Sequence, residues 1–245
     1  MLRFGSNVAA AKESIMREDV YEAVKSLLEK DNSGHGLDHI ERVRHLSLVF
    51  AEKEGADKEV VDLAALLHEV DDYKIFGEDN AKNLTNATRI LDSYHVNPAK
   101  KARVLEIIRT MGYNKSLDGI RPDTLEGAIV SDADMCDAIG AQGILRTYAY
   151  NTSKGNLFFD KTLQPESGTM SASEYRTSKK SHCVQHFFDK LLKIPHIMIT
   201  ESGKEEADRR QRIMIDFLYE LFSEENAEDW KTHLDTFLSE QPQKL

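Results

Sequence analysis

The chain has few of the residues that interrupt regular structure, with 5 prolines and 13 glycines among 245 residues. Its 2 cysteines, Cys136 and Cys183, are far apart and form no CxxC pair. This spacing predicts buried thiols and argues against a disulfide framework or a cysteine-based zinc site. No apolar run reaches the roughly 18 residues of a membrane span, and the N-terminal segment lacks the apolar core of a signal peptide. These absences predict a cytoplasmic protein without a membrane partner.

Positive charge is also scarce, since 32 Lys and Arg residues face 42 Asp and Glu residues and the net charge is -10. Broad nucleic-acid binding needs a basic surface, so nucleic acid is not an expected partner. A small phosphorylated ligand stays compatible with this charge, because a bound metal ion can supply positive charge locally.

Apolar residues recur with the 3.6-residue period of helices, and the alternating pattern of strands is hard to find. The sequence therefore predicts an all-α fold. Helices are expected at Glu18–Glu29, Asp38–Glu52, Glu59–Val70, Asn80–Tyr94 and Pro98–Met111, within Leu125–Tyr150, and at Lys179–Leu192, Glu205–Ser223 and Glu225–Leu238.

These helices are expected to form a single domain over residues 1–245. Its core covers about residues 20–150. A polar, glycine-containing stretch at about 151–178 is expected to be a long loop or lid, where function is often found. Further helices at about 179–240 are expected to pack on the core.

A histidine followed by acidic residues ends an apolar run in the segment LAALLHEVDDYK. His68 follows the run, and Glu69, Asp71 and Asp72 come after it. Acids buried beside a histidine cost free energy unless a cation neutralises them. His39 lies near the expected start of another helix, so two helices can direct side chains to one point. Divalent metals accept neutral imidazole and carboxylate, and the pattern therefore predicts a metal site.

Three aspartates, Asp132, Asp134 and Asp137, lie in the otherwise apolar and small segment SDADMCDAIGA. Asp134 and Asp137 share a helix face, whereas Asp132 and Asp134 point in roughly opposite directions. One of the three is expected to complete the metal site. Each acid alone is more often a cap or a solvated residue. The combination is more specific: a histidine, a His–acid pair about 29 residues later, and an aspartate about 65 residues beyond.

These segments resemble the HD-domain superfamily of metal-dependent phosphohydrolases, and in particular a small bacterial branch. That branch has a GHGxxHxxRV entry, an ALLHDxxDYK centre and a DADxxDAIGAxGI segment. Here they read GHGLDHIERV, AALLHEVDDYK and DADMCDAIGAQGI. The segments HCVQHFFDKLLKI and ADRRQRIMIDFL are also similar. The resemblance covers roughly residues 34–218 and implies an all-α fold, in agreement with the periodicity.

The resemblance implies a ligand set for one divalent ion (Mn, Mg, Fe, Co or Ni). The ligand positions are His39, His68, Glu69 and Asp134. Asp132 is the alternative to Asp134, which is preferred because the last ligand of the family is usually the aspartate of an Ala-Asp pair. The absence of histidines between His95 and His182 favours one metal over two.

Roles in catalysis and substrate binding follow from the same resemblance. Asp72 falls four residues after His68 and is expected on the same helical face, where related hydrolases have an acid that activates the attacking water or relays protons. His35 and Arg42 match positions near the substrate or the ligands. Basic positions of the branch are matched by Lys74, Arg146, Lys190 and Arg210. Some of these are expected to contact phosphates, and the alternative for each is a solvated cation or an ion pair.

The chain departs from the family at Glu69, because the signature pair is His-Asp. Glutamate is one methylene longer, which moves the carboxylate by about 1.5 Å, and a displacement of about 1 Å can cost on the order of 100-fold in rate. Either Asp71 or Asp72 is a candidate to compensate for the shift.

Three functions are therefore open. The first is a metal-dependent phosphohydrolase acting on a phosphoester or phosphoanhydride, most simply in a nucleotide. The second is a weakly active or inactive protein that binds a nucleotide as a sensor or scaffold. The third is a metal-free helical interaction domain. The expected partner is a small phosphorylated substrate, and a second copy of the chain is a further candidate.

Overall fold

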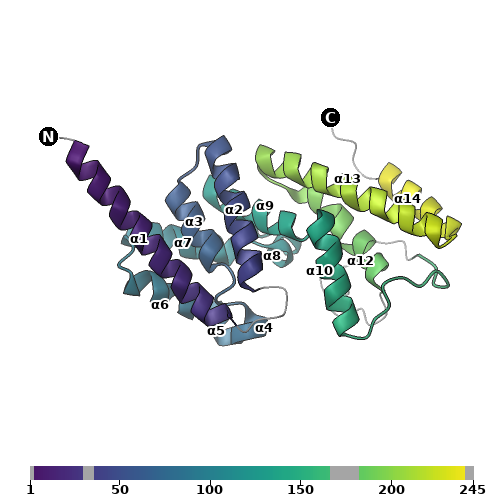
Figure 1. Cartoon of the computed structure of the whole chain (residues 1–245), viewed down its shortest axis with the longest axis horizontal. Coiled ribbons are helices and arrows are strands. Elements are labelled where there is room, and N and C mark those ends of the chain that lie inside the picture. The colour runs from purple at the N-terminus through teal and green to yellow at the C-terminus, as the bar shows by residue number, and fades with distance from the viewer. Residues whose placement is uncertain (1–2, 30–35, 166–181, 241–245) are drawn as a thin grey trace. The chain divides into compact units, whose positions relative to one another are not determined.

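The computed structural model describes residues 3–29, 36–165 and 182–240. The chain forms two compact units, residues 1–111 with 120–133, and residues 112–119 with 134–245. The described residues form helices joined by turns and contain no β-strand (Figure 1). The predicted all-α fold class is confirmed, and the single domain over residues 1–245 stays a prediction.

Unit 1 is a succession of helices linked mostly by short turns. They are α1 (Arg3–Leu28), α2 (Leu37–Glu54), α3 (Lys58–Leu67), α4 (Tyr73–Phe76), α5 (Glu78–Asn83), α6 (Thr85–Ser93), α7 (Pro98–Thr110) and most of α9 (Leu125–Asp137).

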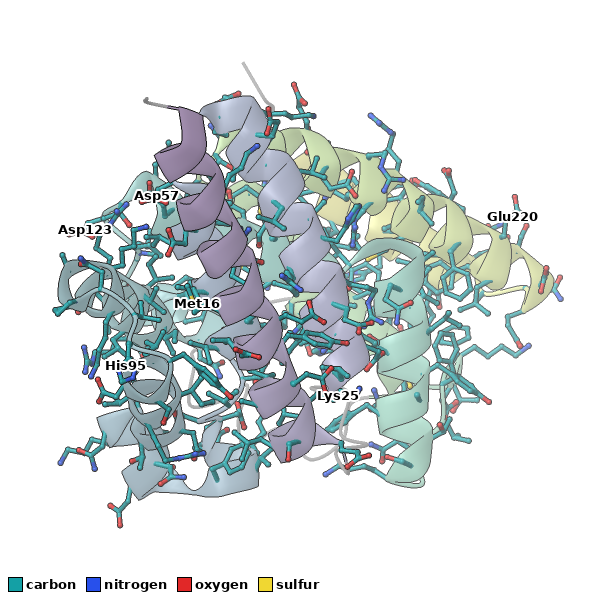
Figure 2. The ribbon with its side chains drawn as sticks, turned by 60° about the vertical axis from the view of Figure 1, so that its left-hand side comes forward. Met16, Lys25, Asp57, His95, Asp123 and Glu220 are labelled. Atoms are coloured by element: carbon teal, nitrogen blue, oxygen red, sulfur yellow. The ribbon has the colours of Figure 1, made fainter. Side chains whose placement is uncertain are left out.

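Helix α3 is the centre of unit 1. All its residues from Val60 to Leu67 are buried, and burial on every side is what a helix with so few polar residues indicates. Helices α1, α2 and α7 pack against it. Figure 2 shows α1, with Met16 and Lys25, beside α2. Because α3 is enclosed, its last turn places the following residue, His68, in the interior of the unit.

Asp62 is the one charged residue in the buried part of α3, and arginines neutralise it. Arg44 of α2 donates two hydrogen bonds to its carboxylate, at 2.5 and 3.0 Å, and Arg17 of α1 lies 3.8 Å away. A bidentate guanidinium–carboxylate pair is strong and directional. The pair between Arg44 and Asp62 holds α2 and α3 together in one relative position.

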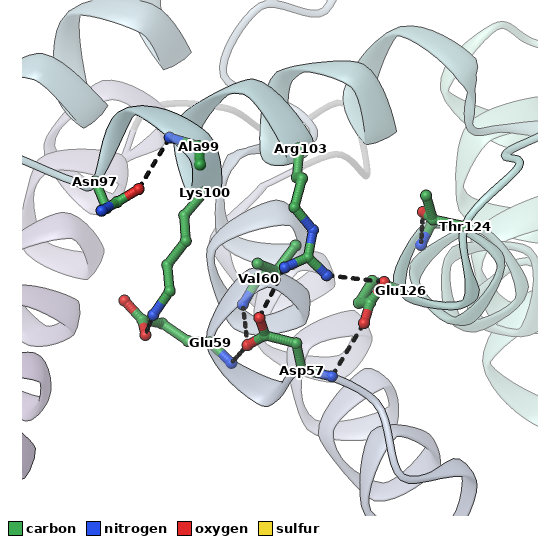
Figure 3. Close-up of polar contacts among 10 residues, drawn as sticks. Asp57, Glu59, Val60, Asn97, Ala99, Lys100, Arg103, Thr124 and Glu126 are labelled. Atoms are coloured by element: carbon green, nitrogen blue, oxygen red, sulfur yellow. Dashed lines mark hydrogen bonds and ion pairs between the residues drawn. The ribbon is translucent and has the colours of Figure 1, made fainter.

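A polar network joins the first turns of α3 and α9 to α7 (Figure 3). Asp57 caps α3 by accepting hydrogen bonds from the backbone N–H groups of Glu59 and Val60, at 3.2 and 3.4 Å. Arg103 of α7 contacts both Asp57 (2.9 Å) and Glu126 (3.1 Å). The backbone N–H of Asp57 also donates to Glu126, at 3.1 Å. The network holds the beginning of α9 inside unit 1.

Unit 2 contains the end of α9 and the remaining helices. These are α8 (Tyr113–Leu117), α10 (Gly140–Ser153), α12 (Cys183–Asp189), the 3₁₀ helix η1 (Leu191–Ile197), α13 (Glu201–Glu224) and α14 (Glu228–Glu240).

Trp230 of α14 is the centre of an aromatic cluster in unit 2. Its ring centroid lies 5.5 Å from that of Phe159 and 5.9 Å from that of Phe222. His182 and His233 also belong to the cluster, with centroids 5.0 and 6.1 Å from Trp230. One buried ring nitrogen of each histidine, Nδ1 of His182 and Nε2 of His233, has no hydrogen-bond partner among the described residues.

Acid is expected to destabilise unit 2 through these two histidines. Burial lowers the pKa of His182 and of His233 below the ordinary 6.5, although Asp160 and Glu240 act in the opposite direction. The unfolded chain then binds protons that the folded chain does not. The contribution of the two neutral histidines to the free energy of unfolding is therefore complete above about pH 6.5. It is lost as the pH falls through their pKa values in the folded protein.

The midpoint of thermal unfolding should consequently be lower at pH 5.5 than at pH 7.5. The variant His233→Phe keeps an aromatic ring in the cluster and should show a smaller difference between the two pH values. An identical difference in the variant and the wild type would contradict this explanation.

Two predicted helices are interrupted in the structure. The helix predicted at Asn80–Tyr94 is divided into α5 and α6 by Leu84, which is buried and has a left-handed backbone with φ of 49°. The region Leu125–Tyr150 is divided into α9 and α10 before Gly140, whose φ is 74°. Backbone in this region suits glycine and is strained for other residues. The glycine therefore marks the end of one helix and the start of the next.

The predicted long loop at about 151–178 begins later than expected, because α10 continues to Ser153. Residues 154–165 contain no helix or strand. Phe159 joins the aromatic cluster, and the Lys161 side chain donates a hydrogen bond to the carbonyl of Glu225 at 2.7 Å. Residues 166–178 lie outside the described residues.

Both cysteines are buried, as the sequence predicts, and neither forms a disulfide among the described residues. Among the described residues, every helix is too short or too polar to cross a membrane.

Candidate metal centre

Ligand atoms of four side chains meet at one point. His39 lies near the start of α2, His68 and Glu69 follow α3 directly, and Asp134 lies in the last turn of α9. One ligand atom of each lies within 4.8 Å of the ligand atoms of the others. The four residues are those that the sequence predicts as metal ligands. Asp134 follows Ala133 on the same helix, α9.

The two imidazoles face each other across this point. Their Nε2 atoms are 3.1 Å apart, and Oε1 of Glu69 lies 3.4 Å from Nε2 of His39 and 3.7 Å from Nε2 of His68. Two ligand atoms about 2.1 Å from one ion are about 3.0 Å apart at a right angle and about 3.4 Å apart at a tetrahedral angle. The three atoms therefore have close to the spacing of ligands around a single ion.

The tautomer of His68 is fixed by the end of its own helix. Nδ1 lies 2.8 Å from the carbonyl oxygen of Ala65. A carbonyl only accepts hydrogen bonds, so Nδ1 carries the proton and donates it. Nε2 of the neutral ring then directs its lone pair at the cluster. Orientation of a ligand histidine by a backbone carbonyl is typical of metal sites.

Burial and charge also fit a cation. His39 is 1% exposed and Glu69 is 7% exposed, so the cluster lies largely out of water. Two carboxylates in such a place require compensating charge. One divalent ion supplies that charge, and the two-histidine, two-carboxylate set suits a transition metal.

Asp71 is a structural residue and not a member of this group. Its carboxylate accepts hydrogen bonds from the backbone N–H groups of Asn86 and Ala87, both at 2.9 Å. The Asn86 side chain donates in return to the carbonyl of Val70 at 2.8 Å. These contacts tie the turn that carries His68 and Glu69 to the first turn of α6. Burial raises the pKa of Asp71 above its usual value, while the two backbone hydrogen bonds lower it.

Asp71→Ala is expected to lower the free energy of unfolding by about 1–3 kcal/mol, because it leaves two N–H groups in a buried place without their acceptor. Chemical denaturation of the metal-free protein measures this change. The matched variant is Asp72→Ala, which removes one hydrogen bond, from the backbone N–H of Lys74 at 2.8 Å, at an exposed position. Equal losses of unfolding free energy in the two variants would show that Asp71 does not stabilise the turn more than Asp72 does.

The predicted helical face shared by His68 and Asp72 is wrong. Helix α3 ends at Leu67, His68 begins a turn, and Asp72 is the N-cap of the separate helix α4. The acids after His68 lie in a turn and not in a helix. The carboxylates of Asp71 and Asp72 stabilise this turn, because they accept hydrogen bonds from backbone N–H groups of the later helices α6 and α4. The proton-transfer role of Asp72 stays a prediction, without the argument from helix spacing.

The other residues predicted near the substrate have varied surroundings. Arg42 lies one turn after His39 on α2 and pairs with Asp38 at 2.8 Å. The exposed Lys74 lies with its Nζ 5.8 Å from the ring centroid of Tyr73. Nζ of Lys190 is 4.5 Å from the ring centroid of Tyr113. His35 lies outside the described residues.

Arg146 and Arg210 contact the end of α9. Arg146 pairs with Asp137 at 2.8 Å, and Arg210 donates to the carbonyl of Cys136 at 2.7 Å. These contacts correspond to the ion-pair alternative for Arg146, and the phosphate contacts of both residues stay predictions. Asp132 is fully buried, and the group of ligand atoms includes Asp134 and not Asp132. The geometry therefore favours Asp134 as the last ligand.

Comparison with known proteins assigns the family. Residues 36–139 match the model of the HD domain. The solved structure of an HD-superfamily hydrolase from Bacillus thuringiensis has 35% sequence identity and a TM-score of 0.69, over 88% of this chain and 99% of that one. The chain belongs to the HD-domain superfamily. HD domains bind divalent metals, and the four clustered side chains form a group that could hold one.

The chain is also similar to the uncharacterized protein YpgQ of Bacillus subtilis. It is 30% identical over 212 residues, which cover 86% of this chain and 94% of YpgQ. Its crystal structure in complex with ADP has a TM-score of 0.65 and covers 87% of this chain and 96% of YpgQ.

Proposed function

We propose that this HD protein is a metal-dependent phosphohydrolase that cleaves a phosphoester or phosphoanhydride bond of a nucleotide. The observation that carries the proposal is the convergence of His39, His68, Glu69 and Asp134 within 4.8 Å. Similarity to an HD-superfamily hydrolase supports hydrolysis, and the ADP complex of YpgQ supports a nucleotide as the ligand.

A divalent ion held by these four side chains would polarise a phosphoryl oxygen and lower the pKa of a water molecule. Asp72 is the proposed acceptor for the proton that the attacking water loses. One of its carboxylate oxygens accepts the backbone N–H of Lys74, and the carboxylate retains further lone pairs for a proton. Some of the basic residues Lys74, Arg146, Lys190 and Arg210 are proposed to neutralise the charge that develops on the phosphate. His35 and Arg42 are proposed to act near the substrate, as the family resemblance implies.

The resident ion is proposed to be a single Mn, Mg, Fe, Co or Ni ion, in a cytoplasmic protein without nucleic-acid or membrane partners. A second copy of the chain is a candidate partner.

The direct test is a panel of nucleoside mono-, di- and triphosphates incubated with protein loaded with Mn²⁺ or Mg²⁺. Release of phosphate or pyrophosphate from at least one nucleotide is the expected result. Absence of turnover across the panel, in protein that elemental analysis shows to contain metal, would overturn the proposal. Nucleotide binding without turnover would favour a sensor or scaffold, for which Glu69 in place of the family's aspartate is the specific indication.

A further inference from the structure

Two arginines bind the last turn of α9, which carries Asp134. Nη1 of Arg210, from α13, donates to the carbonyl of Cys136 at 2.7 Å. Nη1 of Arg146, from α10, donates to the Asp137 carboxylate at 2.8 Å and lies 3.4 Å from the Asp137 carbonyl. All these groups belong to unit 2. The end of the helix is therefore attached to two neighbouring helices.

The last turn of a helix needs such attachments, because its final carbonyls lack partners within the helix. After α9 the chain turns, and the Cys136 carbonyl accepts a 3.2 Å bond from the backbone N–H of Ile139 together with the Arg210 bond. A guanidinium at a helix C-terminus also interacts favourably with the helix dipole. Loosening this turn would move Asp134, since Asp134 is two residues before Cys136.

Arg210 is itself held firmly in place. Its Nε donates to Oε1 of Glu206, one turn earlier on α13, at 2.6 Å. Its side-chain stem packs on Gly140, where an added Cβ would lie 2.9 Å from Cβ of Arg210. The side chain is 18% exposed. A restrained guanidinium of this kind can define the position of the backbone that it binds.

We propose that Arg210 is a positioning residue for the metal ligand Asp134. Its guanidinium fixes the Cys136 carbonyl, this bond fixes the last turn of α9, and the turn sets the place of the Asp134 carboxylate. The inference rests on the proposed metal site, and it gives Arg210 a role other than the phosphate contact predicted from the sequence.

The neighbouring Arg209 provides a matched control. It donates two hydrogen bonds to the same Glu206, at 2.8 and 2.7 Å, but its side chain is 55% exposed. Within the described residues none of its hydrogen bonds reaches α9. Substitution of Arg209 removes the same charge and the same partner without removing a hydrogen bond to the end of α9.

The test measures Mn²⁺ binding by titration calorimetry on the full chain. Arg210→Met is expected to weaken Mn²⁺ binding about 10- to 100-fold, which is typical for the loss of residues that orient metal ligands. Arg209→Met should change the affinity by less than about twofold. Arg210→Lys should lie between the two, because an ammonium cannot reproduce the fork of the guanidinium. Co²⁺ absorption should differ between Arg210→Met and wild type, since it reports ligand geometry.

The outcomes separate the inference from the proposed function. Folded Arg210→Met and Arg210→Lys that bind Mn²⁺ as tightly as wild type would overturn the inference and leave the metal site standing. If Arg210→Met does not fold, as judged by circular dichroism, Arg210→Lys decides the question alone. Wild-type protein that binds no Mn²⁺ or Co²⁺ would overturn the metal site, and the inference with it.

Discussion

His39→Ala should remove the bound metal and lower nucleotide hydrolysis about 1,000-fold or more. The imidazole of His39 is 1% exposed, and its Nε2 lies 3.1 Å from that of His68 and 3.4 Å from the Glu69 carboxylate. A catalytic metal supplies several kcal/mol of transition-state stabilisation. Each ~1.4 kcal/mol corresponds to a factor of ten in rate, so its loss has an effect of this size.

The control for this variant is His45→Ala. His45 lies on the same helix, α2, and is exposed, so its removal should leave metal content and turnover unchanged. Metal content is measured by elemental analysis and turnover by phosphate release. A His39→Ala protein that is folded and retains both would refute the role of this cluster. Retained metal with lost turnover would mean that His39 is needed for turnover and not for holding the ion.

The buried helix at the centre of unit 1 could be predicted from the sequence. An apolar run that ends in a histidine and acids predicts a helix whose last turn reaches the interior, and α3 has this form. The pairing of His68 with a histidine 29 residues earlier and an aspartate on a third helix followed from composition and resemblance. The buried helix is a local feature of the sequence, and the ligand pattern recurs across a family. Both can therefore be recognised in a single sequence.

The supports of the site could not be predicted in the same way. Asp71 caps a helix that begins fourteen residues later, whereas capping signals in sequence are read within a few residues. The hydrogen bond from Arg210 to Cys136 joins residues 74 positions apart. The left-handed backbone conformation at position 84 is adopted by a leucine, and not by the glycine or asparagine that would indicate it in the sequence. Such contacts depend on tertiary packing, which periodicity does not encode.

The position of Asp72 shows how an early helix end changes a functional argument. Spacing by four residues places two side chains on one face only while the helix continues. Here the helix ends before His68, and the carboxylates of Asp71 and Asp72 are taken by backbone N–H groups of α6 and α4. Any proton transfer by Asp72 therefore takes place from the turn between α3 and α4, where the acid has a different direction from that in a continuing helix.

The last prediction concerns Glu69, and we expect Glu69→Asp to lower turnover about 100-fold. The glutamate carboxylate already reaches both histidines, at 3.4 and 3.7 Å. The surrounding turn is held by the bond from the Asp72 N–H to the Glu69 carbonyl at 3.1 Å and by the bonds of Asp71 to α6. The shorter aspartate would leave its oxygen about 1.5 Å away, and displacements near 1 Å cost on the order of 100-fold.

Two further variants separate length from charge. Glu69→Gln keeps the length and removes the negative charge, so it should weaken Mn²⁺ binding more than Glu69→Asp does. Glu78→Asp makes the same exchange at an exposed position in the first turn of α5 and should have no effect. A gain of turnover in Glu69→Asp would reverse the interpretation. It would mean that Glu69 makes the chain a nucleotide-binding protein with weak hydrolysis. In a site that is adapted to glutamate, the shorter aspartate should not raise turnover.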